Sequence, residues 1–107
     1  MPMRELTSRE RKTLRGVAHP LEPLVHIGKQ GLTEGVFQQI DEQLRHHELI
    51  KVKFLAGKEE KRELTEQIAQ RLACDVPGVV GHIAILYRQN EDPDERVIDF
   101  PNLHAPA

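Results

Sequence analysis

The sequence predicts an α/β domain in which helices and strands follow one another in the order α-β-α-β-α-β-β. Apolar residues recur at helical spacing in three segments, and short apolar or alternating segments separate and follow them. Strand–helix–strand units favour parallel pairing. The last two strands, Val76–Val80 and Ile83–Tyr87, suit an antiparallel hairpin around Gly81-His82. We therefore expect an α+β two-layer sandwich, with the helices on one face of a small mixed sheet.

The first helix is predicted to begin at Thr7-Ser8-Arg9-Glu10, which fits a capping box. It should end near His19, because Pro20 disfavours the helical conformation in the residue before it. A short strand over residues 24–27 leads into the loop Gly28-Lys29-Gln30-Gly31. Thr33 then provides an N-cap for a second helix. The apolar side of that helix is formed by Val36, Phe37, Ile40 and Leu44.

The clearest strand follows the second helix. Three apolar residues, Ile50, Val52 and Phe54, alternate with Lys51 and Lys53, so one strand face is expected in the core and the other should present two lysines. A turn at residues 56–57 precedes a third helix, which we expect from about residue 58 to residue 73. In the strand after it, residues 77–78 are Pro-Gly, which predicts an edge strand or a bulge.

The composition indicates a single cytoplasmic domain. The chain has 107 residues, of which 38% are hydrophobic and 30% charged. No apolar run approaches the roughly 20 residues that span a bilayer, so no membrane partner is expected. The N-terminus lacks the apolar stretch of a signal peptide. Cys74 is the single cysteine and cannot form an internal disulfide, which is typical of a reducing compartment.

Charge is unevenly distributed although the formal net charge is only −2. Residues 1–31 contain six basic and three acidic residues, whereas residues 89–107 contain one basic and five acidic residues. We therefore divide the chain into a domain at residues 1–88 and an acidic, Pro-containing tail at residues 89–107, expected to be partly mobile. The alternative is that residues 97–100 dock as a short edge segment. The local charge of the first part, rather than the total, sets the field that a phosphate chain meets.

The loop Gly28-Lys29-Gln30-Gly31 is the main candidate for a binding site. Glycine permits sharp turns and close approach of a ligand to the backbone, and the following helix N-terminus favours anions. A plain tight turn is an equally good reading of the loop alone. The loop lacks the Gly-Lys-Ser/Thr of a nucleotide-binding P-loop and the third glycine of a dinucleotide fingerprint. The remaining use of a Gly-x-x-Gly loop is to clamp the backbone of a nucleic acid.

Four segments of the sequence carry recognisable motifs: 14–23 (LRGVAHPLEP), 27–36 (IGKQGLTEGV), 47–53 (HELIKVK) and 86–88 (LYR). These motifs, in this order, resemble those of the CRM-domain family of bacterial YhbY-like RNA-binding proteins. The resemblance implies a fold similar to the C-terminal domain of a bacterial translation initiation factor. It also implies binding of ribosomal RNA during assembly of the large ribosomal subunit, with residues 28–31 in the contact surface.

These observations predict an RNA-binding protein without catalytic activity. No catalytic constellation is visible in the sequence, so no cofactor or small-molecule substrate is expected. The adjacent His46 and His47 point in different directions on a helix, so no metal site is expected there. The chain is expected to be a monomer. The alternative is a protein-interaction module on a ribosome assembly intermediate. The residues predicted to contact RNA are Gly28, Lys29, Gln30, Gly31, Arg9, Arg11, Lys12, Arg15, Lys51 and Lys53.

Overall fold

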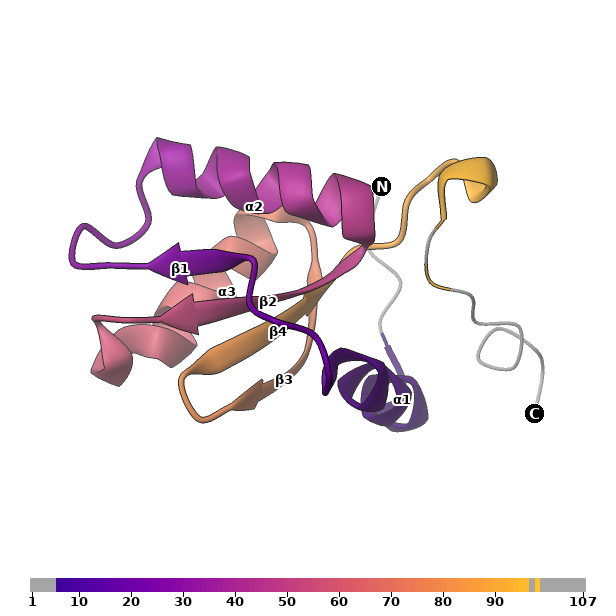
Figure 1. Cartoon of the computed structure of the whole chain (residues 1–107), viewed down its shortest axis with the longest axis horizontal. Coiled ribbons are helices and arrows are strands. Elements are labelled where there is room, and N and C mark those ends of the chain that lie inside the picture. The colour runs from indigo at the N-terminus through magenta and orange to yellow at the C-terminus, as the bar shows by residue number, and fades with distance from the viewer. Residues whose placement is uncertain (1–5, 97, 99–107) are drawn as a thin grey trace.

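The computed structural model describes residues 6–96 and 98, and it contains the predicted elements in the predicted order (Figure 1). The α+β class is therefore confirmed. A short 3₁₀ turn at Lys58–Glu60 precedes the third helix, and another lies at Pro93–Glu95 in the tail. The helices are α1 (Ser8–Ala18), α2 (Glu34–His47) and α3 (Lys61–Leu72), and the strands are β1 (Val25–Ile27), β2 (Leu49–Phe54), β3 (Asp75–Val80) and β4 (Ile83–Tyr87).

The four strands form one mixed sheet in the order β1-β2-β4-β3. β1 pairs with β2 in parallel, and β4 pairs antiparallel with both β2 and β3. The hairpin of β3 and β4 is as predicted, and the register shift between Asp75 and Gly78 confirms the bulge expected from Pro77-Gly78. The parallel pairing expected of strand–helix–strand units is found for β1 and β2 but not for β2 and β3, because β4 lies between them. β1 and β2 are the single parallel pair in the described sheet.

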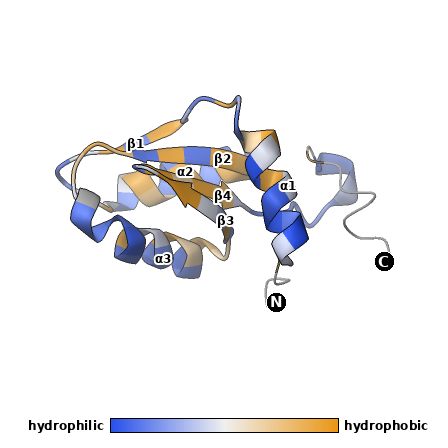
Figure 2. Cartoon of the chain, turned by 90° about the horizontal axis from the view of Figure 1, so that it is seen from below, coloured by the Kyte–Doolittle hydropathy of each residue, from blue (hydrophilic) through white to orange (hydrophobic). Residues whose placement is uncertain are grey.

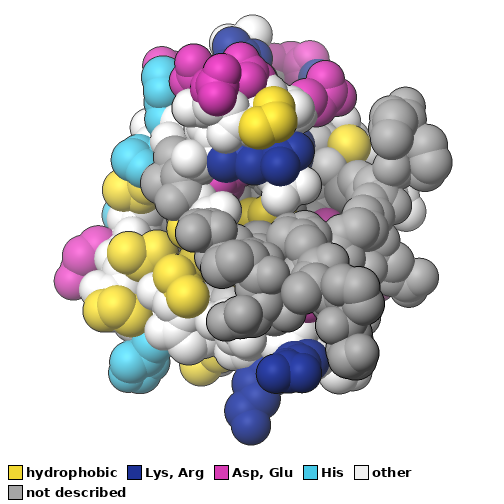
Figure 3. Space-filling model, turned by 90° about the vertical axis from the view of Figure 1, so that its right-hand side faces the viewer, with side chains coloured by type: hydrophobic (Ala, Val, Ile, Leu, Met, Phe, Trp, Pro, Cys, Tyr) yellow, Lys and Arg dark blue, Asp and Glu magenta, His cyan; other side chains and the backbone are white. Residues whose placement is uncertain are grey.

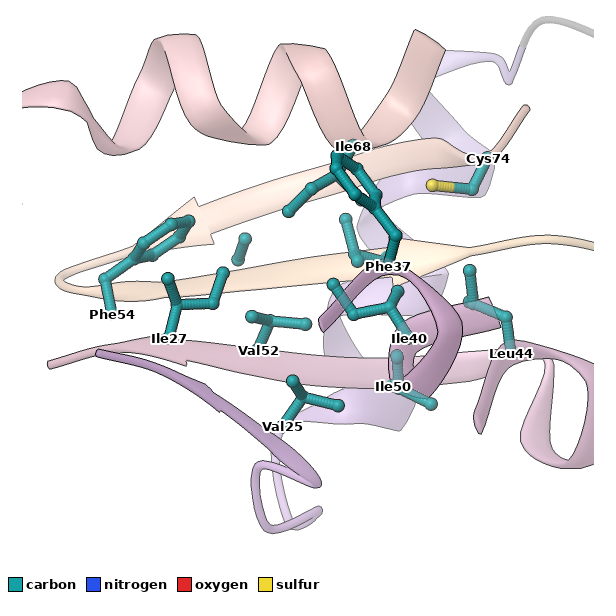
Figure 4. Close-up of a cluster of buried hydrophobic side chains, with 12 residues drawn as sticks. Val25, Ile27, Phe37, Ile40, Leu44, Ile50, Val52, Phe54, Ile68 and Cys74 are labelled. Atoms are coloured by element: carbon teal, nitrogen blue, oxygen red, sulfur yellow. The ribbon is translucent and has the colours of Figure 1, made fainter. Parts of the chain in front are cut away.

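α2 and α3 cover one face of the sheet and enclose the main aliphatic core with it (Figure 4). Alternate residues of the strands point into this core, where they meet Phe37 and Ile40 from α2 and Ile68 from α3. Arg88 joins the two helices that cover this core. Its guanidinium donates to the Asp41 carboxylate of α2 at 2.8 Å and to the Leu72 carbonyl of α3 at 3.0 Å. The sheet residues buried here are Val25, Ile27, Ile50, Val52, Phe54, Ala84 and Leu86.

α1 lies on the opposite face, which corrects the expectation that all helices cover one side. It crosses one end of the sheet, so Figure 1 views it nearly end-on while the strands run across the page (see also Figure 2). Leu14 and Ala18 pack there against Leu49, Ile85 and Tyr87, all of which are buried. The two-layer sandwich of sheet and α2–α3 therefore carries a third, partial layer. α1 begins with the predicted capping box, in which Thr7 and Glu10 exchange hydrogen bonds.

The start of the tail is attached to the domain by a buried carboxylate. Glu48 has 0% exposure, and its two oxygens accept hydrogen bonds from the amides of Asn90 at 2.5 Å and Ile98 at 2.8 Å. Ile98 packs beside the α1 core. Glu48 adopts φ 62°, a conformation that L-residues avoid. At this end of the molecule most Asp and Glu side chains in view lie together (Figure 3). Val97, Asp99 and Phe100, the other residues of the predicted edge segment, lie outside the described residues.

Glu48→Gln is expected to lower the free energy of unfolding by about 1–3 kcal/mol, because glutamine keeps one acceptor oxygen and leaves the other backbone amide without its acceptor. Urea unfolding measures the loss, and hydrogen exchange should show faster exchange at the Asn90 and Ile98 amides. The matched control is Glu42→Gln, at an exposed position on α2, which should leave both quantities unchanged. If the Asn90 and Ile98 amides exchange as slowly in the Glu48 variant as in the unmodified protein, the anchoring role of Glu48 is contradicted.

Candidate nucleic-acid interface

The loop between β1 and α2 is a tight turn at one end of the sheet, at the far left of Figure 1. The Gly31 amide donates to the Gly28 carbonyl at 3.0 Å, which closes the turn, and Lys29 and Gln30 at its tip are exposed. Thr33 caps α2 through a hydrogen bond from the Val36 amide at 3.2 Å. Because the first N–H groups of a helix have no intrahelical acceptor, the loop and helix start together favour an anion.

The two loop glycines have different structural requirements. Gly31 has φ +70°, so the turn itself requires a residue that tolerates the left-handed region. Gly28 has no such φ, and a Cβ added to it would have nothing within 4 Å. The fold therefore does not need glycine at position 28. The space next to the Gly28 backbone is open, as it is at Gly31, so the fold leaves both glycine backbones of the turn accessible.

The negative charge nearest the loop is neutralised within the protein. Glu34, the first residue of α2, forms an ion pair with Arg71 of α3, and the hydrogen bond from Arg71 lowers the pKa of the Glu34 carboxyl. The same guanidinium lies over the Phe37 ring at 4.1 Å. Glu34 therefore stays ionised, but its charge is balanced by Arg71. Lys29 is left as the exposed charge at the tip of the loop.

The open face of the sheet joins the loop to α1. Lys51 and Lys53 lie on this face, as predicted from the alternation in β2. Lys53 is exposed, whereas Lys51 is half-buried and donates to the His19 carbonyl at the end of α1 at 2.9 Å. The strand register also places His26 on this face beside Lys53, and His26 is exposed. The sequence prediction missed His26, although its position between the buried Val25 and Ile27 signals an outward side chain.

The basic residues of α1 divide into two groups. Arg9 and Lys12 are exposed, and so is Arg15, but Arg15 and the half-buried Arg11 donate hydrogen bonds to backbone carbonyls within the protein. Arg11 donates to the Leu6 carbonyl at 2.7 Å, and Arg15 donates to the Pro77 carbonyl of β3 at 2.8 Å. α1 packs at the end of the sheet away from the glycine loop. The predicted contact residues therefore form a strip, from the loop across Lys53 and Lys51 to α1, rather than one compact cluster.

Thiol chemistry and grouped metal ligands can be assessed in the part of the chain that the structure describes. Burial raises the pKa of the Cys74 thiol to about 12, so the nucleophilic thiolate is disfavoured. Within residues 6–96 and 98, no three His, Cys, Asp or Glu side chains are grouped as metal ligands. In the same part of the chain, no helix has the length and apolar character needed to cross a membrane.

The family assignment follows from the sequence comparison. Residues 6–88 match the model of the CRS1/YhbY (CRM) domain, which spans all four strands and three helices. The chain belongs to the CRS1/YhbY (CRM) domain family. The predicted resemblance is thereby confirmed. The glycine loop, the open sheet face and α1 all lie inside the CRM domain, and the acidic tail follows it.

Individual CRM-domain relatives agree over most of their length. A Haemophilus influenzae protein named as an RNA-binding protein is 41% identical over 84% of this chain and 92% of its own length. A probable RNA-binding protein of Pseudomonas aeruginosa is 33% identical over 86% of this chain and 89% of its own length. The solution structure of a hypothetical protein from Staphylococcus aureus, described as a candidate RNA-binding protein, superimposes with a TM-score of 0.74 at 32% identity. That superposition covers 89% of this chain and 100% of the other.

Arg15→Gln is expected to lower the free energy of unfolding by about 1 kcal/mol, because it removes a charged hydrogen bond that joins α1 to β3. The Arg15 side chain also packs on Gly78, where an added Cβ would lie 2.7 Å from the Arg15 Cδ. Urea unfolding measures the effect. Lys12→Gln is the matched control, since Lys12 is exposed on the same helix, and its change should stay within about 0.5 kcal/mol. If the Arg15→Gln variant and the unmodified protein have the same unfolding midpoint, the hydrogen bond from Arg15 does not stabilise the fold.

Proposed function

We propose that this protein is a cytoplasmic RNA-binding protein that acts by binding alone. It binds ribosomal RNA as a monomer during assembly of the large ribosomal subunit. The observation that carries RNA binding is the unobstructed Gly28 backbone in a turn that also presents Lys29 and the start of α2. The names of the relatives from Haemophilus influenzae and Pseudomonas aeruginosa support the same partner. The ribosomal role rests on the family resemblance.

The proposed mode of binding follows from the placement of the charges. The loop residues Gly28–Gly31 hold the RNA backbone through amide groups and Lys29. Lys53 continues the positive strip over the sheet, and Arg9 and Lys12 extend it along α1. Lys51, Arg11 and Arg15 have carbonyl partners within the protein, so we assign them secondary roles in RNA contact. Phosphate contacts of this kind provide affinity and position rather than sequence readout.

Gly28→Asp is expected to weaken RNA binding about 10-fold or more, because it places a negative charge where a phosphate approaches. Gly28→Ala is the matched control, since it adds the Cβ alone into open space and should stay within about 3-fold of the unmodified protein. Fluorescence anisotropy with a labelled single-stranded RNA measures the affinities. The slope of log affinity against log salt should fall by about 0.7 for each phosphate that the variant no longer binds. Thermal melting confirms that both variants fold.

Unchanged RNA affinity in a folded Gly28→Asp protein would contradict the clamp. Crosslinking in cells, with the crosslinked RNA and protein residues both mapped, tests the ribosomal target. Crosslinks to large-subunit RNA from the loop or from β2 are expected. A protein complex that survives nuclease and high salt, with no RNA crosslinked to this surface, would instead favour the protein-interaction module.

A further inference from the structure

We propose that the open sheet face beside the glycine loop is a nucleobase platform, on which His26 stacks against an unpaired base of single-stranded RNA. The inference rests on the proposed RNA-binding function. It specifies that function further, because it names the form of RNA that is bound and a contact other than phosphate. The platform comprises one side chain from each strand: His26, Lys53, Ile83 and Val80.

The strand register aligns these four side chains in a row. His26 of β1 pairs with Lys53 of β2, Lys53 pairs with Ile83 of β4, and Ile83 pairs with Val80 of β3. Opposed residues of neighbouring strands point to the same side of a sheet. Since strands lie about 4.8 Å apart, three spacings give the row a length of about 14 Å. α1 covers the other end of this face, where Leu49 and Tyr87 are buried, and leaves the row uncovered.

The row is accessible and combines an aromatic ring, a cation and apolar surface. His26 and Lys53 are exposed, Val80 has 63% exposure, and Ile83 is half-buried. Bases of single-stranded RNA stack on the rings of Phe, Tyr, Trp or His. Phe37, Phe54 and Tyr87 are all buried, so the described part of the chain exposes no Phe or Tyr ring for this purpose. His26 is the ring that the register turns toward the open face, and the aliphatic side chains extend the surface beside it.

The position of the platform fits a strand that is already held by the loop. His26 is two residues before Gly28 in the chain, so a base next to a clamped phosphate would lie over the start of the row. Lys53 stands between the ring and the aliphatic side chains, where its charge complements the RNA backbone. A duplex keeps its bases paired and stacked and therefore has none to place on the platform. This makes single-stranded RNA the expected ligand.

The test compares His26→Ala and His26→Phe with His47→Ala, a control at an exposed histidine on α2. The probes are a labelled RNA of about 12 nucleotides without self-complementarity, long enough to cover one binding site, and the same strand annealed to its complement. His26→Ala should weaken single-strand binding about 5- to 150-fold, the range for loss of one stacked base. His26→Phe should stay within about 3-fold of the unmodified protein, because it keeps a stacking ring. His47→Ala should have no effect, and His26→Ala should leave duplex binding unchanged.

The platform would be overturned if the His26→Ala variant and the unmodified protein bound the single strand with equal affinity. The same result is expected if a protein segment, rather than RNA, occupies the row. It would equally be overturned if His26→Phe lost as much affinity as His26→Ala, or if the duplex lost affinity in parallel. Restoration by His26→Lys but not by His26→Phe would indicate a phosphate contact instead of stacking. If Gly28→Asp weakens binding and His26→Ala does not, the platform alone fails. If the unmodified protein binds neither RNA, the proposed function fails with it.

Discussion

The parallel pairing of β1 with β2 determines how the glycine loop, His26 and Lys53 are arranged on the candidate surface. It buries Val25 and Ile27 against α2 and α3, and it turns His26 outward beside Lys53. It also brings the glycine loop to the same end of the sheet as the hairpin of β3 and β4. A shift of this register by one residue would bury His26 and expose two aliphatic side chains, at a cost that the core would not tolerate. The core packing thus also maintains the candidate surface on the other side of the sheet.

Local features of the fold were predictable because they depend on neighbouring residues. The capping box at Thr7 and Glu10 and the alternation in β2 need nothing beyond residues nearby in the chain. Strand order was not predictable in this way, since an apolar pattern does not identify a strand's partners. One signal was available: Ile83–Tyr87 is apolar throughout, and such a run is typical of a strand buried on both faces. That property gives β4 its central place and gives α1 an apolar surface to cover.

The candidate surface shows the same division between local and long-range information. The glycine loop was recognised from four adjacent residues, whereas the structural use of Arg15 depends on a carbonyl 62 residues away. Basic residues look equivalent in a sequence, but a guanidinium with five donors in a fixed fork is well suited to join elements of the fold. Lys29 and Lys53 are exposed, whereas Arg11 and Arg15 each donate to a backbone carbonyl, so the two lysines are better placed to meet an RNA backbone.

A central strand of the sheet, β4, is the last strand to be synthesised. β2 ends at Phe54 and β4 ends at Tyr87, so at about 5–20 residues per second the ribosome takes roughly 2–7 seconds to supply the partner of β2. During that interval one edge of β2 has unpaired backbone groups, and such an edge can pair with another chain. Lys51 and Lys53 lie on this strand, and lysines discourage edge-to-edge association. The two lysines that lie on the open face of the finished sheet therefore also discourage such pairing while β4 is still being synthesised.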